Sequence, residues 1–147
     1  MRMNWKAMGL AGLAWMSLGF GILALHFGFL PTGIELLAQA VGLFLAGAIS
    51  AALLAATLAG QRTALGRWSV QVGYLFFAPL GLMTALLTPA EIETGTGGLP
   101  LSSALLAALA ITLLASLAVA VGLGFVGSLA MAAHAVAVRV QRRPAVV

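Results

Sequence analysis

Long apolar runs separated by short polar breaks dominate the chain. Four stretches carry no charged residue, and they cover residues 7–34, 36–61, 68–90 and 94–138. Because an α-helix rises about 1.5 Å per residue, about 20 apolar residues are enough to cross the hydrocarbon core of a bilayer. The pattern therefore predicts four membrane-spanning helices, over about 7–30, 36–60, 68–88 and 105–138.

The expected fold is all-α, a polytopic transmembrane four-helix bundle that forms a single domain over residues 1–147. A proline and a glycine within 31–35 favour a turn, so we expect an outer loop there. The glycine- and threonine-rich segment 89–99 is expected to be the second outer loop. The single inner loop is expected over 61–67.

Charged residues divide between the two sides of this arrangement. Two basic residues precede the first predicted helix, two lie in the inner loop, and three follow the fourth helix. The three acids, Glu35, Glu91 and Glu93, lie in the two outer loops. Because Lys and Arg are retained in the cytoplasm during insertion, we expect both termini to be cytoplasmic. An odd number of spans would place the last three arginines outside, so the pattern favours an even number.

The fourth apolar stretch is too long for one perpendicular crossing. As a single helix, residues 99–138 would measure about 60 Å, twice the thickness of the hydrocarbon core. The favoured interpretation is one helix that begins near Pro100, with its first turns projecting beyond the outer surface or lying along it. The alternative is a break near Gly122 and Gly124, which would make five spans and reverse the tail.

Composition excludes most other classes of protein. The chain is 63% hydrophobic and 7% charged, with a mean hydropathy of +1.14, whereas about a quarter of a soluble domain is charged. The absence of cysteine excludes disulfides, thiolate metal sites and catalytic thiols. The net charge of +4 does not indicate nucleic-acid binding, because the basic residues flank apolar runs and do not cover a soluble face.

The expected location is a bacterial inner (cytoplasmic) membrane, in which the chain is a multi-pass protein. The excess of arginine over lysine is typical of a GC-rich bacterial genome. A cleaved signal peptide at the N-terminus is the less favoured alternative. The first apolar run is longer than a usual signal-peptide core, and no clear cleavage motif follows it.

Small residues recur four positions apart, a spacing that lines one face of a helix. One such row, in the second predicted helix, consists of Gly42, Ala46 and Ser50. Another, in the fourth predicted helix, consists of Ala120, Gly124 and Ser128. Because lipid provides no hydrophobic drive between helices, close approach through small residues promotes association. The rows therefore predict helix-packing faces, either inside the bundle or against other membrane subunits or a homo-oligomer.

A candidate polar site lies at the first outer loop. His26, Glu35 and Gln39 reach similar depths if the first two predicted helices fold back on each other, and an imidazole near a carboxylate relays protons or holds a ligand. In the alternative interpretation, His26 bonds a backbone carbonyl or water and Glu35 only marks the outer end. Pro79 should kink the third helix, either as a transporter hinge or as a purely structural feature.

Several aromatic residues are expected at depth, where bundle core is favoured over a quinone pocket. They are Trp15, Tyr74, Phe76 and Phe77. The Tyr74 hydroxyl needs a hydrogen-bond partner in lipid, and Gln71 is a near neighbour on the same turn.

Motifs of known enzymes and metal sites are missing from the sequence. His26 and His134 are expected near opposite surfaces, which prevents them from sharing one haem or metal ion. We therefore expect no catalytic residue, no metal site and no cofactor. The favoured function is that of a non-enzymatic helix-packing subunit or scaffold of a membrane complex. The alternatives are a small oligomeric transporter or channel with the outer polar site, and a haem- or quinone-associated membrane subunit.

Overall fold

Long helices form nearly all of the structure, a computed structural model that describes residues 4–28, 33–93 and 101–141. The elements are α1 (Trp5–Ile22), the π-helical turn η1 (Leu23–Phe27), α2 (Gly33–Gly60), α3 (Ala64–Glu93) and α4 (Leu101–Gln141). These described ranges contain no strand, and the all-α prediction is confirmed.

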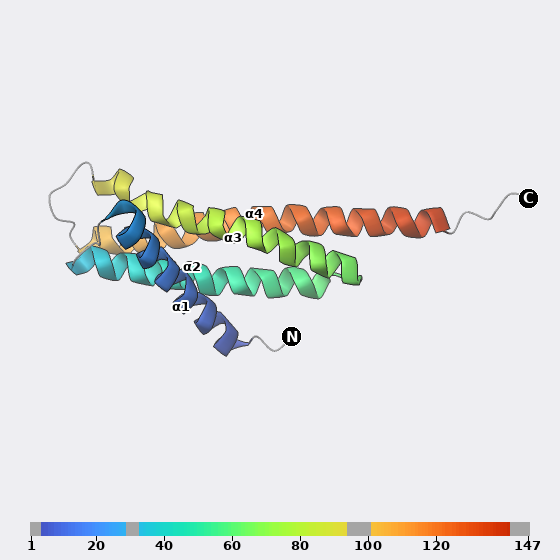
Figure 1. Cartoon of the computed structure of the whole chain (residues 1–147), viewed down its shortest axis with the longest axis horizontal. Helices are drawn as coiled ribbons and strands as arrows, with labels where there is room; N and C mark the ends of the chain where they lie inside the picture. The colour runs from blue at the N-terminus through green and yellow to red at the C-terminus, as the bar shows by residue number, and fades with distance from the viewer. Residues whose placement is uncertain (1–3, 29–32, 94–100, 142–147) are drawn as a thin grey trace, which may run out of the picture.

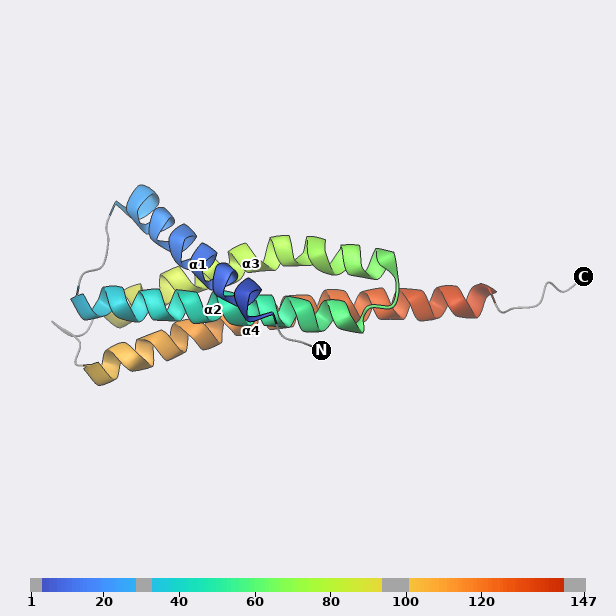
Figure 2. The same ribbon diagram turned by 90° about the horizontal axis from the view of Figure 1, so that it is seen from below.

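The helices alternate in direction along the chain (Figure 1). α2, α3 and α4 lie side by side along the long axis, whereas α1 crosses α2 obliquely (Figures 1 and 2). The start of α1, the α2–α3 connection and the end of α4 point the same way. We call this the basic end, because the described part of the chain has Arg62, Arg67 and Arg139 there.

Four helical segments are long and apolar enough to cross a membrane. They are Trp5–His26, Gly33–Gly60, Ala64–Leu87 and Ala104–Gln141. The number of spans predicted from the charge pattern is thus matched by four candidate helices. Which side of a membrane the basic end faces stays a prediction.

Local chemistry defines several helix ends. Asn4 begins α1, because its side-chain oxygen accepts a hydrogen bond from the Ala7 amide at 3.3 Å. The Thr63 hydroxyl begins α3 by accepting from the Gly66 amide at 3.0 Å. Gly28 ends η1 with φ of 68°, a left-handed conformation that suits glycine. The connection between α2 and α3 is shorter than the predicted 61–67, since α3 already begins at Ala64.

Both predicted outer loops are also shorter than the sequence indicated. α2 starts at Gly33, two residues before Glu35, and α3 continues to Glu93, five residues into the segment 89–99. Alanine and glutamate after Pro89 are good helix formers, and this preference extends the helix past the proline. The remainders of the two loops, 31–32 and 94–99, lie outside the described residues.

Trp15 sits at the centre of the core. Its side chain is 6% exposed and inserts between two glycine faces. A Cβ atom added at Gly47 of α2 would lie 2.8 Å from Trp15 Cβ and Cγ, and one added at Gly81 of α3 would lie 3.1 Å from Trp15 Cη2. These glycines therefore let α1 approach both neighbours. Fully buried aliphatic residues from the other helices, including Leu43 and Ile111, complete the core.

α4 runs unbroken through Gly122 and Gly124, as a single helix of 41 residues. Ala104 and Ala108 pack against Ala38 near the start of α2, so the two helices begin at nearly the same level. The excess length of α4 therefore projects at its C-terminal end, past the α2–α3 connection (Figure 1). The first turns of α4 pack on α2 through small side chains, and their position relative to a membrane surface stays a prediction.

The projecting part, residues 131–141, is called the overhang below. Each of its residues is exposed except Val138, which is half-buried. Among its apolar side chains, Met131, Val136 and Val140 are each more than half exposed. The overhang is thus an apolar helix end that the described part of the chain leaves largely uncovered.

Candidate functional site

The three residues of the predicted outer polar site lie in different environments. His26 is exposed in η1, Glu35 is half-buried in the first turn of α2, and Gln39 is 4% exposed one turn further on. Gln39 shares a helix face with Leu43, which packs against Gly19 of α1. The amide thus lies inside the bundle and the imidazole outside it, and a joint site stays a prediction.

The π-helical turn is the unusual backbone feature at this end. It places one extra residue in a turn over Leu23–Phe27 and contains His26. Such turns are rare and frequently occur at functional sites. This turn could not be predicted from the sequence, because a π-turn has no hydropathy signature.

The predicted small-residue row of α2 lies inside the bundle. Ala46 and Ser50 are fully buried. A Cβ atom added at Gly42 would lie 2.9 Å from Ile111 Cγ2 and 3.2 Å from the Ala108 carbonyl oxygen of α4. This row allows α2 and α4 to approach closely.

The predicted row of α4 turns away from the bundle. Ala120 is half-buried, Gly124 and Ser128 are exposed, and a Cβ atom added at Gly124 would meet no atom within 4 Å. The buried residues of α4 instead alternate steps of three and four, and they include Ala104, Ala108, Ile111, Ala115, Val119, Gly122 and Leu123. A strict step of four drifts around a helix of 3.6 residues per turn, so the predicted row leaves the interface.

Tyr74 finds its hydrogen-bond partner on another helix. Its hydroxyl lies 3.0 Å from the Ser50 hydroxyl, which also donates to the Gly47 carbonyl at 2.8 Å. Gln71, the neighbour indicated by the sequence, is exposed. The bond between Ser50 and Tyr74 joins α2 to α3 inside the bundle.

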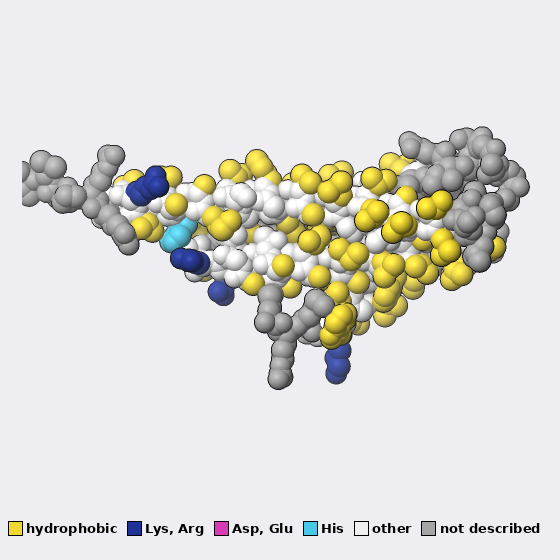
Figure 3. Space-filling view, turned by 180° about the vertical axis from the view of Figure 1, so that it is seen from behind, with side chains coloured by type: hydrophobic (Ala, Val, Ile, Leu, Met, Phe, Trp, Pro, Cys, Tyr) yellow, Lys and Arg dark blue, Asp and Glu magenta, His cyan; other side chains and the backbone are white. Residues whose placement is uncertain are grey.

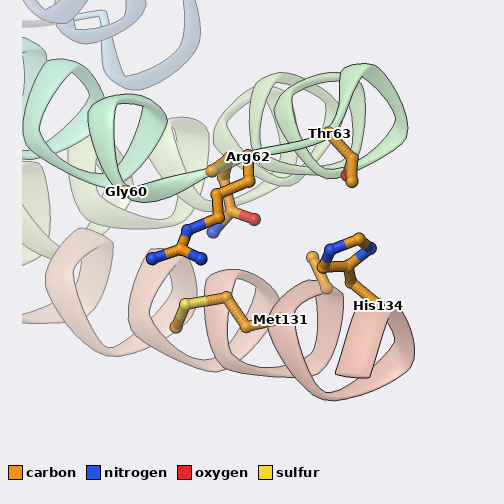
Figure 4. Close-up of a pocket in the computed structure, with 7 residues that line it drawn as sticks. Gly60, Arg62, Thr63, Met131 and His134 are labelled. Carbon is orange, nitrogen blue, oxygen red and sulfur yellow. The ribbon is translucent and has the colours of Figure 1, made fainter. Parts of the chain in front are cut away.

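A pocket lies at the basic end, between the α2–α3 connection and α4. It has a volume of about 280 Å³ and is lined by Gly60, Gln61, Arg62, Thr63, Ala130, Met131 and His134. Figure 4 shows the Arg62 side chain extending toward α4, with Met131 below it and His134 opposite Thr63. We call this the Arg62–His134 pocket.

Buried hydrogen bonds hold the wall of this pocket. Gln61 is 5% exposed, and its Nε2 donates to the Gly127 carbonyl of α4 at 3.2 Å. Arg67 Nε donates to the Gln61 carbonyl at 3.4 Å. The connection is therefore tied to α4 on one side and to α3 on the other, directly before Arg62.

Sequence analysis did not identify this pocket. His134 was considered only as a haem ligand, and the Gln61–Arg62 pair only as the end of an apolar run. Two features of the sequence point to this pocket. Gln61 directly precedes the basic residue Arg62 between two predicted helices, and His134 lies near the inner end of another predicted helix. Their proximity depends on the register of α2 against α4, which hydropathy does not give.

The remaining predicted features are placed as follows. Pro79 is exposed on α3, which continues through it and is visibly curved in Figure 2. His26 and His134 lie at opposite ends of the bundle, in η1 and in the overhang. The described residues contain no group of three or more metal-ligating side chains. Comparisons of the chain with protein-family models, curated proteins and solved structures find no match.

Proposed function

We propose that this chain is a non-enzymatic subunit or scaffold of a bacterial inner-membrane complex that works by helix packing. The observation that carries the proposal is the outward face of α4. Gly124 and Ser128 are exposed there, and the row continues at the same spacing into the overhang at Ala132. A small-residue face next to an uncovered apolar helix end is suited to another transmembrane helix.

The occupant that fits this face is a helix from a second membrane chain, either a partner subunit or a second copy. The open space around Gly124 allows a backbone approach that larger residues would prevent. By contrast, the row of α2 is already occupied by Ile111 and Ala108 of α4. Only the α4 row remains accessible for a contact between chains.

The length of α4 and the positions of the basic side chains are compatible with a bundle that crosses the bilayer at a tilt. α4 would measure about 60 Å, whereas a bilayer with its headgroups is about 40–45 Å thick. Figure 3 shows the described Lys and Arg side chains along a slanted line from the overhang toward the start of α1. A membrane surface along this line lets α4 cross obliquely and brings these cations to headgroup level, on the cytoplasmic side in our proposal.

Gly124→Leu tests the packing proposal without disturbing the fold. Because an added Cβ meets no atom within 4 Å, the variant should keep its stability in detergent. We expect it to lose the partner helix, measured as loss of co-purified membrane proteins or of the oligomer in mild detergent. Gly9→Leu on α1 is the matched control, since the space around Gly9 is equally open. Equal assembly of both variants and the wild type would refute the proposal.

A transporter or channel is the second candidate, favoured by the π-helical turn around His26. In this case, purified protein alone should carry solute or proton flux in liposomes. His26→Ala should abolish the flux, whereas Gly124→Leu should leave the flux per folded chain unchanged. The packing proposal predicts the reverse, in which Gly124→Leu loses assembly and His26→Ala keeps it.

A further inference from the structure

The Arg62–His134 pocket has a charged lining, and the described part of the chain places no carboxylate side chain near it. Arg62 and His134 come from opposite walls, and Arg67, in the first turn of α3, donates to the carbonyl of the wall residue Gln61. The chain has three acids in all, and none lies near this end. Glu35 is 27 residues before Arg62, about 40 Å along α2.

The other two acids are equally distant. Glu91 and Glu93 follow Arg67 by at least 24 residues on the same helix, about 36 Å away. Among the described residues, no side-chain carboxylate thus lies within reach of the two guanidinium groups. An anionic ligand can supply the counter-charge.

The pocket also presents hydrogen-bond donors from both of its walls. Thr63 begins α3, and the unbonded amides of a first helical turn carry a partial positive charge. The bonds of Gln61 to Gly127 and of Arg67 to Gln61 hold the connection in place. A planar guanidinium and an imidazole over such a helix start form donors suited to a phosphate group.

The surroundings indicate a phosphate that belongs to a lipid. Met131 and Ala130 supply an apolar floor to the pocket. Trp68, next to Arg67, is 62% exposed, as is typical of an aromatic residue at the membrane interface. Basic pockets between transmembrane helices on the cytoplasmic side bind the headgroups of anionic lipids.

We propose that the Arg62–His134 pocket binds the phosphate of an anionic phospholipid headgroup. The phosphate accepts hydrogen bonds from Arg62 and His134, and the acyl chains lie along the apolar surface beside Met131. This site is independent of the α4 packing face, which lies at Gly124 and Ser128.

The test is native mass spectrometry of the purified full chain in detergent, titrated with phosphatidylglycerol or with phosphatidylcholine. We expect one phosphatidylglycerol to bind at least about tenfold more tightly than phosphatidylcholine. Arg62→Gln should remove about tenfold of that affinity, and His134→Leu about threefold. Arg139→Gln is the matched control, since it removes the same charge from the same end outside the pocket, and it should change the affinity by less than about twofold.

Inorganic phosphate distinguishes the two sources of the ligand. If the lipid is the ligand, millimolar phosphate leaves phosphatidylglycerol bound. Displacement by phosphate, with the same dependence on Arg62, would show that the pocket recognises the anion and not the lipid. Equal losses in Arg62→Gln and Arg139→Gln, or equal affinities for the two lipids, would overturn the proposal. Arg62 and His134 are exposed, so unchanged melting temperatures should accompany every variant.

Discussion

Gly122→Ala should destabilise the bundle although alanine is the better helix former. A Cβ atom added at Gly122 would lie 2.2 Å from Phe77 Cγ and 2.3 Å from Phe77 Cδ1. The Phe77 ring therefore packs directly on the Gly122 backbone, where α3 meets α4. Because the overlap involves the base of the ring and not a flexible end, a small rotation cannot relieve it.

Two opposing terms set the size of this effect. Replacing glycine by alanine inside a helix is favourable by about 0.5–1 kcal/mol. Inserting a methyl group into a closely packed contact costs about 1–3 kcal/mol. For Gly122→Ala we therefore expect a net loss of about 1–2 kcal/mol in the free energy of unfolding. For Gly124→Ala, which meets no neighbouring atom, only the favourable term remains.

Reversible unfolding in mixed micelles of mild detergent and SDS measures both variants, followed by the fluorescence of the tryptophans, including the buried Trp15. Phe77→Ala supplies the decisive background, because without the ring Gly122→Ala should become neutral or stabilising. Equal stabilities of Gly122→Ala and Gly124→Ala would refute the reasoning. So would a loss from Gly122→Ala that persists without the Phe77 ring.

Two further predictions concern α3. In a double-mutant cycle of Ser50→Ala and Tyr74→Phe, we expect a coupling free energy of about 0.6 kcal/mol, and a coupling of zero would contradict the observed hydrogen bond. Ser50→Ala should be the more costly single change, since it strands the Tyr74 hydroxyl, whereas Ser50 keeps its bond to Gly47 in Tyr74→Phe. Pro79→Ala should raise the free energy of unfolding by up to about 1 kcal/mol, because the alanine amide can donate a hydrogen bond to the Leu75 carbonyl. A marked loss of stability would instead indicate that the proline shapes the contact between α3 and α4.

The number and approximate positions of the helices followed from hydropathy alone. An apolar run has to be helical at membrane depth, because each backbone polar group must be satisfied within the segment. α4 is apolar over nearly its whole length and stays one helix through Gly122 and Gly124. Helix ends were less predictable, since good helix formers such as Ala90 and Glu91 extend α3 beyond its apolar part.

Contacts between helices were beyond the reach of the sequence. The spacing of small residues could not say which positions of α4 face inward. The Tyr74 hydroxyl illustrates the reason: Gln71 is close along the chain, yet Ser50, 24 residues away, is the actual partner. Such pairs depend on helix rotation and register, which a single sequence constrains only weakly.

One register links the overhang and the Arg62–His134 pocket. Gln61 can reach the carbonyl of Gly127 because that residue has no side chain; an added Cβ would lie 3.3 Å from Gln61 Nε2 and 3.0 Å from Thr57 Cγ2. Moving α4 by one turn, about 5.4 Å, would bring the Met131 side chain to this position and fill the pocket. The glycine that fixes the register thus places His134 opposite the α2–α3 connection, and the same register leaves the helix beyond it uncovered.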